Sequence, residues 1–173
     1  MSSHTHVDNA VLDVFFAHNA WANLKMLDYC ANLSDEQLDA SAIGGYGSIR
    51  DTLSHILRAE TSYVKRNHGK LPPRPLQTDQ VASFDQMREV AAWTSEELRQ
   101  LAQTAQADTL VVEELDKERV DYKLASLIVQ AITHAAEHRA HINAVITHLG
   151  MEPPDVSLWM YLEEIGEFNI IQK

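Results

Sequence analysis

Four histidines lie close together in residues 132–149, which read ITHAAEHRAHINAVITHL. An α-helix advances about 100° per residue, so residues three and four apart share one face. With His134 taken as zero, His138 falls at about +40°, His141 at about −20° and His148 at about −40°. One stripe of this helix therefore carries imidazoles among small and aliphatic residues. An imidazole that faces inward must be hydrogen-bonded or coordinated, because burying a polar ring without a partner costs free energy.

Three further segments have apolar residues at helical spacing, over residues 8–31, 48–67 and 83–106. The histidine helix is expected to begin at Ser126 and to end before Gly150. Four long amphipathic segments without a strong strand signal predict an all-α fold, a four-helix bundle in a single domain over residues 1–173. We also expect short helices over 34–40 and 158–166, a proline-containing surface connection over 68–81 and a small hairpin within 108–123 with its turn at Asp116. Asp8 is the expected N-cap of the first helix, and capping-box patterns begin at Ser34 and at Ser83.

The spacing of apolar residues predicts which face of each helix is buried. In the first helix this face includes Val11, Phe15, Trp21, Leu24 and Leu27; in the second, Ile49, Leu53, Ile56 and Tyr63; in the third, Phe84, Met87, Val90, Ala91, Thr94, Leu98 and Leu101; and in the last short helix, Leu158, Trp159, Tyr161 and Leu162.

Composition and charge exclude several classes of function. The formal net charge of −11 repels phosphate and argues against a nucleic-acid-binding surface. No apolar run approaches the roughly 20 residues that a membrane span needs, and the N-terminus lacks the pattern of a secretory signal. The single Cys30 cannot form an internal disulfide, so we expect a reducing cytoplasm and a buried, structural thiol.

His134 and His138 form an H-x-x-x-H motif that places two imidazoles one turn apart, a geometry that can chelate a metal. The helix reads H-A-A-E-H rather than H-E-x-x-H, so it does not indicate a zinc protease. A third protein ligand must come from another helix, because His141 lies about 10 Å along the axis from His134. The candidates for this third ligand are His18, Asp51, His55 and Glu60.

Four blocks of sequence resemble the DinB-like (YfiT-like) metalloenzyme superfamily: HNAWANLKML, TLSHILRAE, THAAEHRAHI and PDVSLWMYLEEIG. The resemblance covers the chain from about Asp13 to Gly166, and the order and spacing of the blocks are more specific than any one block. It implies an up-down-down-up four-helix bundle with three histidines at one end that bind a divalent metal.

Carried over residue by residue, the family's ligands fall on His55, His134 and His138. Periodicity alone places His55 on the flank of its apolar stripe, so its assignment rests on the resemblance. His141 stands where the family commonly has glutamine, which implies a place in the pocket wall. The implied metal is zinc, with nickel or iron as alternatives. Glu60, Asp51 or Asn19 could orient the ligand imidazoles.

Three functions are compatible with such a site. The resemblance implies a metal-dependent enzyme, such as a thiol S-transferase that joins a low-molecular-weight thiol to a small electrophile. The second is metal-dependent hydrolysis with Glu137 or Glu60 as general base. The third is a non-enzymatic metal-binding protein of a stress response. The family also implies a homodimer, and we expect no nucleic-acid or membrane partner.

Overall fold

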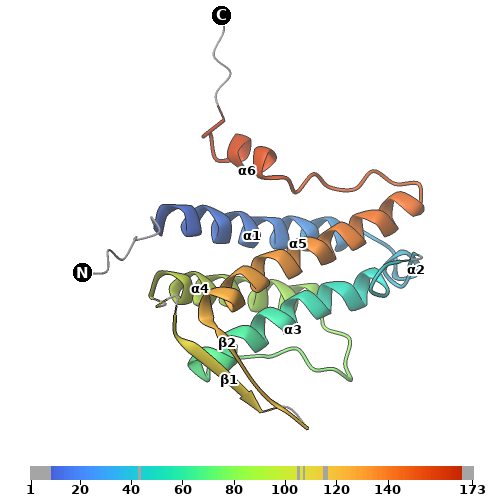
Figure 1. The fold of residues 1–173 in the computed structure, drawn as a ribbon. Coiled ribbons are helices and arrows are strands. Elements are labelled where there is room, and N and C mark those ends of the chain that lie inside the picture. Colours follow the sequence, from blue (N-terminus) through green and yellow to red (C-terminus); the bar gives the residue numbers. More distant parts are fainter. Residues whose placement is uncertain (1–8, 43, 105, 107, 115–116, 169–173) are drawn as a thin grey trace, which may run out of the picture.

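Four long helices make up most of the described chain, which confirms the all-α prediction (Figure 1). A computed structural model of the protein describes residues 9–42, 44–104, 106, 108–114 and 117–168. Two antiparallel strands form the predicted small hairpin. In chain order the elements are α1 (Asn9–Cys30), α2 (Asp35–Leu38), α3 (Ile49–His68), α4 (Phe84–Thr104), β1 (Leu110–Glu114), β2 (Arg119–Lys123), α5 (Leu124–His148) and α6 (Leu158–Glu164).

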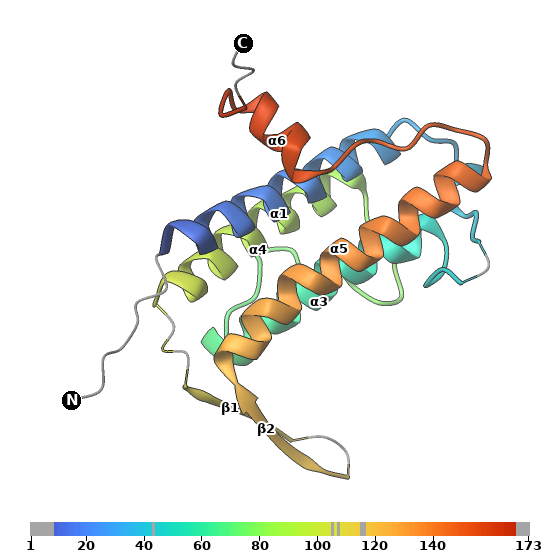
Figure 2. The ribbon, with the colours of Figure 1, turned by 45° about the horizontal axis from the view of Figure 1, so that its top comes forward.

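The long helices pack side by side. α1 contacts α4 and α5, and α3 contacts the same two helices from the other side. In both ribbon views α1 and α5 run in one direction and α3 and α4 in the other (Figures 1 and 2). The connection from α3 to α4 spans the length of the two helices, because these helices run the same way. None of the helices in the described part of the chain combines the length and hydropathy that a membrane crossing requires.

Local sequence explains most helix ends. Ser48 caps α3 by accepting a hydrogen bond from the Asp51 backbone N–H, and Gly69 ends that helix in the left-handed conformation with φ 66°. The predicted start of α5 at Ser126 is wrong by two residues. β2 runs directly into α5, and the Leu124 N–H donates to the Thr109 carbonyl at the base of the hairpin, so no side-chain cap is needed.

The predicted buried faces hold for α3 and α4 but not for α1. Val11 and Phe15 are 52 % and 49 % exposed, although their spacing predicted a core position. α1 carries apolar residues around much of its circumference, so periodicity did not select a face. The residues of α1 that are buried are Phe16, Asn19, Ala22, Asn23, Met26, Leu27 and Cys30. Two asparagines thus face the interior, and their partners are described below.

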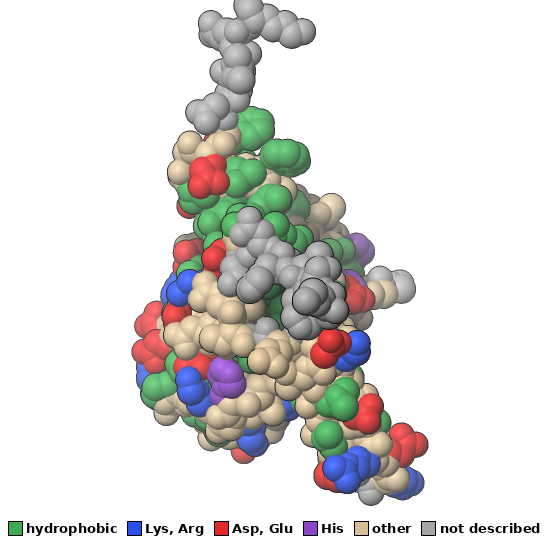
Figure 3. Space-filling view, turned by 60° about the vertical axis from the view of Figure 1, so that its left-hand side comes forward, with side chains coloured by type: hydrophobic (Ala, Val, Ile, Leu, Met, Phe, Trp, Pro, Cys, Tyr) green, Lys and Arg blue, Asp and Glu red, His purple; other side chains and the backbone are tan. Residues whose placement is uncertain are grey.

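The last short helix was predicted to cover the bundle with four apolar side chains, and this is only partly so. α6 contacts α1, but Trp159 is 66 % exposed and Leu158 is 39 % exposed. Trp159 packs against the Phe168 ring instead, at a centroid distance of 5.8 Å. Figure 3 shows hydrophobic side chains gathered at the upper part of the molecule, where α6 lies.

Candidate metal centre

Three histidines from two helices converge at one place. His55 lies in the second turn of α3, and His134 and His138 lie one turn apart near the middle of α5. Each offers one ring nitrogen, and these three atoms lie within 4.8 Å of one another. His55 thus lies near the start of α3, and its partners lie near the middle of α5.

The distances within the cluster approach those of a coordination site. The Nε2 atoms of His55 and His134 are 3.0 Å apart. Two nitrogen ligands of a tetrahedral zinc ion, at about 2.0–2.1 Å from the metal, are separated by about 3.4 Å. All three donor nitrogens lie within 4.8 Å of one another, so a small rotation of an imidazole would bring them to this separation.

Burial and mutual repulsion keep these imidazoles neutral. Burial, followed by the charges of the neighbouring histidines, lowers the pKa of His138 to about 4, against a smaller opposing effect of Glu137. The pKa values of His55 and His134 are also lowered, chiefly by burial. A neutral imidazole is the form that binds a metal, so the cluster is ready for a cation at neutral pH.

Not every ring nitrogen of the cluster is satisfied by a hydrogen bond, and the donor set suits a cation. The Nδ1 atoms of His134 and His138 are buried and find no hydrogen-bond partner within the described residues. Burying such an atom without a partner costs free energy. The donor set contains three imidazoles and no lysine or arginine, which suits a divalent metal of borderline softness.

Aromatic rings surround the three histidines. Tyr46 stacks on His55 at a centroid distance of 4.1 Å and meets His138 edge-on at 4.8 Å. Tyr63 approaches His134 edge-on at 6.1 Å, and His141 lies 5.3 Å from His138. Sequence analysis missed Tyr46. The available signal was an aromatic residue among three glycines directly before the helix that carries His55.

His18 and Asp51, two candidates for the third ligand, lie elsewhere. The His18 Nε2 atom is 2.9 Å from the Val156 carbonyl oxygen, so this ring ties α1 to the chain segment before α6. Asp51 accepts a hydrogen bond from the Ser48 hydroxyl at the start of α3. Neither is among the residues that converge with His55, as far as the described chain extends.

The expectation that Glu60 or Asn19 orients the ligand imidazoles is not met, because both belong to a buried polar network. Glu60 Oε1 accepts from the Asn19 and Asn23 side-chain amides, both at 2.9 Å, and Oε2 accepts from the Thr94 hydroxyl at 2.8 Å. Arg139 donates to the carbonyl oxygens of the same two asparagines. Each asparagine amide therefore lies between the Arg139 guanidinium and the Glu60 carboxyl group. Its carbonyl oxygen faces the guanidinium, and its N–H group faces the carboxyl group.

This network lies next to the metal cluster in sequence and joins four helices. Arg139 directly follows His138, and Glu60 lies five residues after His55. Glu60 is fully buried and Arg139 is 3 % exposed. Burial raises the pKa of Glu60, against the effect of its hydrogen bonds and of Arg139, and burial lowers the pKa of Arg139 to about 10.

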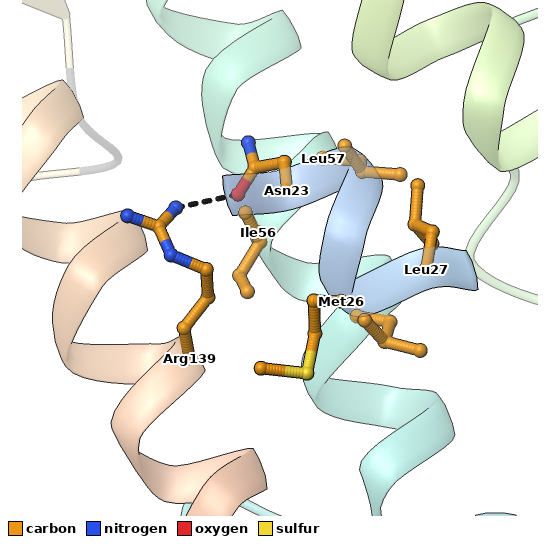
Figure 4. Close-up of a pocket in the computed structure, with 7 residues that line it drawn as sticks. Asn23, Met26, Leu27, Ile56, Leu57 and Arg139 are labelled. Carbon is orange, nitrogen blue, oxygen red and sulfur yellow. Dashed lines mark hydrogen bonds between the residues drawn. The ribbon is translucent and has the colours of Figure 1, made fainter. Parts of the chain in front are cut away.

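A cavity of about 10 Å³ adjoins the network (Figure 4). Arg139 and Asn23 are its polar lining residues, and Figure 4 shows the hydrogen bond between them beside the apolar side chains of Met26 and Ile56. Its volume is near the lower limit for one water molecule. It is too small to be a substrate pocket, so the chemistry of this region belongs to the histidine cluster.

The family model described as "DinB family" matches residues 1–167. No curated protein matches the chain.

Proposed function

The chain belongs to the DinB family, and from this premise we propose that it binds a divalent metal through His55, His134 and His138 and is a metal-dependent enzyme. The convergence of three neutral imidazoles from α3 and α5 carries the proposal. Three nitrogen ligands leave at least one coordination position for a substrate. Zinc is the first expectation, and nickel or iron would also suit this ligand set.

The reaction we propose is transfer of a low-molecular-weight thiol to a small electrophile. A bound divalent metal lowers the pKa of a coordinating thiol, so that the thiolate is present at neutral pH. The sulfur forms a bond to an electrophilic carbon, the bond from that carbon to its leaving group breaks, and the thiol proton passes to solvent.

The burial of Cys30 supports a thiol substrate that comes from solution. Cys30 is the only cysteine and is completely buried in the apolar core. Burial raises the pKa of its thiol to about 12, so Cys30 carries almost no thiolate at neutral pH. The protein therefore supplies imidazoles and aromatic walls, and the nucleophile is a second substrate.

Metal-dependent hydrolysis is a second candidate, and Glu137 is the observation that favours it. Glu137 is exposed, and its negative charge acts on both His134 and His138. A carboxylate in this position could take a proton from an attacking water. Glu60, the other base considered, is fully buried, and both of its carboxyl oxygens accept hydrogen bonds within the polar network.

Metal content tests the proposed ligands. The protein is purified without residues 1–6, because His4 and His6 could bind metal themselves, and dialysed before elemental analysis. About one metal per chain is expected, with loss in His55→Ala, His134→Ala and His138→Ala. His148→Ala is the matched control, because His148 is an exposed histidine on the same helix. Metal retained in the three variants would refute the site.

A substrate panel then tests the reaction. Low-molecular-weight thiols are offered with monobromobimane as electrophile, alongside a panel of esters and amides for hydrolysis. Metal-dependent thiol transfer that is lost in His134→Ala supports the first proposal, and hydrolysis that depends on Glu137 supports the second. Metal binding without any turnover would support a non-enzymatic role in a stress response.

The remaining partners are also proposals. We infer a homodimer from the family and from the exposed apolar residues of α1 and α6, among them Val14, Phe15 and Trp159. Light scattering coupled to size-exclusion chromatography tests this. A cytoplasmic location fits a chain with a single buried cysteine.

A further inference from the structure

The loop before α3 places the ring of Tyr46 against His55 in the second turn of that helix. Gly44 adopts the left-handed conformation with φ 84°, and a Cβ atom on Gly45 would lie 3.2 Å from the Ala42 carbonyl oxygen. Both positions therefore favour glycine in a tight turn. Ser48 then starts the helix. His55 lies about 9 Å along the helix from Ile49, so the loop must fold back for Tyr46 to reach it.

Tyr46 contacts two of the three proposed metal ligands. Its ring stacks on His55 with an interplanar angle of 27° and meets His138 at 84°. The residue is 49 % exposed, whereas His138 is 7 % exposed. Tyr46 therefore lies at the outer side of the cluster, with one face against His55 and much of the rest toward solvent.

We propose that Tyr46 is a positioning residue of the metal centre, which holds the His55 imidazole in its ligating orientation through ring stacking. The inference rests on the proposed metal function. The Nε2 atom of His55 already points at His134, and a stacked ring limits rotation of the imidazole about its Cβ–Cγ bond. A ligand that is pre-oriented loses less conformational freedom when a metal binds. The ring carries this effect, and the phenol hydroxyl is not needed for it.

Metal affinity in two Tyr46 variants tests the inference. Affinity for Zn²⁺ is measured by competition with a chromogenic chelator in the full chain without residues 1–6. Tyr46→Ala removes the ring and should weaken affinity about two- to tenfold, the range of one aromatic contact. Tyr46→Phe keeps the ring and should bind as the wild type does. Trp159→Ala is the control, because it removes an exposed ring on α6, a helix that carries none of the three histidines.

Two readouts separate positioning from a loss of fold. The thermal midpoint of the metal-free protein should fall by only about 2–4 °C in Tyr46→Ala, since the side chain is half exposed and loses few contacts. The visible absorption bands of bound Co²⁺ should change in Tyr46→Ala and not in Tyr46→Phe, because they report the arrangement of the ligands.

Three outcomes would overturn the inference. Equal Zn²⁺ affinity of Tyr46→Ala and wild type, with binding still dependent on the histidines, would reject the role of Tyr46 and leave the proposed function intact. Equal losses in Tyr46→Phe and Tyr46→Ala would assign the effect to the hydroxyl. Absence of metal binding in the wild type would reject the proposed function and this inference together.

Discussion

Replacing Glu60 by leucine should destabilise the protein far more than the loss of a surface charge. The change leaves three buried donors, from Asn19, Asn23 and Thr94, without the carboxylate that accepts their hydrogen bonds. It also leaves the buried Arg139 without a compensating charge. Breaking a buried charge pair on one side costs about 3–5 kcal/mol. For a chain of this length such a loss lowers the thermal midpoint by roughly 10 °C.

Urea unfolding followed by circular dichroism measures this effect. Chelator is present throughout, so that metal binding does not add to the stability. Glu89→Leu is the matched control, because Glu89 pairs with Arg74 on the surface, and its unfolding midpoint should stay near that of the wild type.

A double-mutant cycle with Arg139→Leu tests whether the carboxyl and guanidinium groups act through the amides between them. Removing both charges should cost less than the sum of the single losses, by about 1 kcal/mol or more. A Glu60→Leu variant as stable as the wild type, or strictly additive losses, would refute the description of this network as one electrostatic unit.

Three further predictions concern single side chains. Metal-free protein should lose stability as the pH falls from about 6.5 to about 4, because His138 is neutral in the folded state, with its pKa lowered to about 4, and takes up a proton on unfolding. Uptake of this proton should lower the free energy of unfolding at pH 5 by at most about 2 kcal/mol, and urea titrations of His138→Asn should show a flatter pH dependence. Cys30 should react with a disulfide reagent at pH 8 only after urea is added, since its thiol is buried with a pKa of about 12; rapid reaction in the folded state would contradict this. Ser48→Ala removes the cap of α3 and should cost about 1 kcal/mol in urea unfolding; an unchanged midpoint would show that the cap is dispensable.

The sequence predicted the helices well because their signals are local. Ser34 and Gln37 form the predicted capping box at α2, and the apolar spacing of α3 and α4 gave their buried faces. At Ser83 only half of the expected box forms, since the Gln86 side chain donates to the Arg74 carbonyl in the connection before α4. The predicted N-cap at Asp8 and the hairpin turn at Asp116 fall outside the described residues.

The spacing of Asn19 and Asn23, one turn apart, predicts amides that hydrogen-bond a neighbouring helix or loop, and the structure confirms this. Their partners could not be predicted, because these are distant in sequence. Asn19 meets Glu60 across 41 residues and Arg139 across 120 residues. Helical periodicity counts only apolar side chains, so the predicted buried face of α1 included Val11 and Phe15, which are exposed. A buried amide is favourable only where the fold provides both a donor and an acceptor.

Residue spacing predicted two of the three histidines of the metal cluster. His134 and His138 share a face by spacing alone, whereas His55 lies at the edge of an apolar stripe. α3 packs against both α4 and α5, so its buried sector is wide and its edge faces α5. The position of Tyr46 depends on a loop conformation, for which spacing gives no rule.

The separation of His55 and His134 by 79 residues has a topological consequence. A metal held by both would close a ring of chain that contains α4, the hairpin and the proline-containing connection between residues 68 and 81. It would act as a reversible cross-link, of the kind that a disulfide provides in a secreted protein. A single protease cut within that ring would then leave two fragments held together for as long as the metal stays bound, and a chelator would weaken their association.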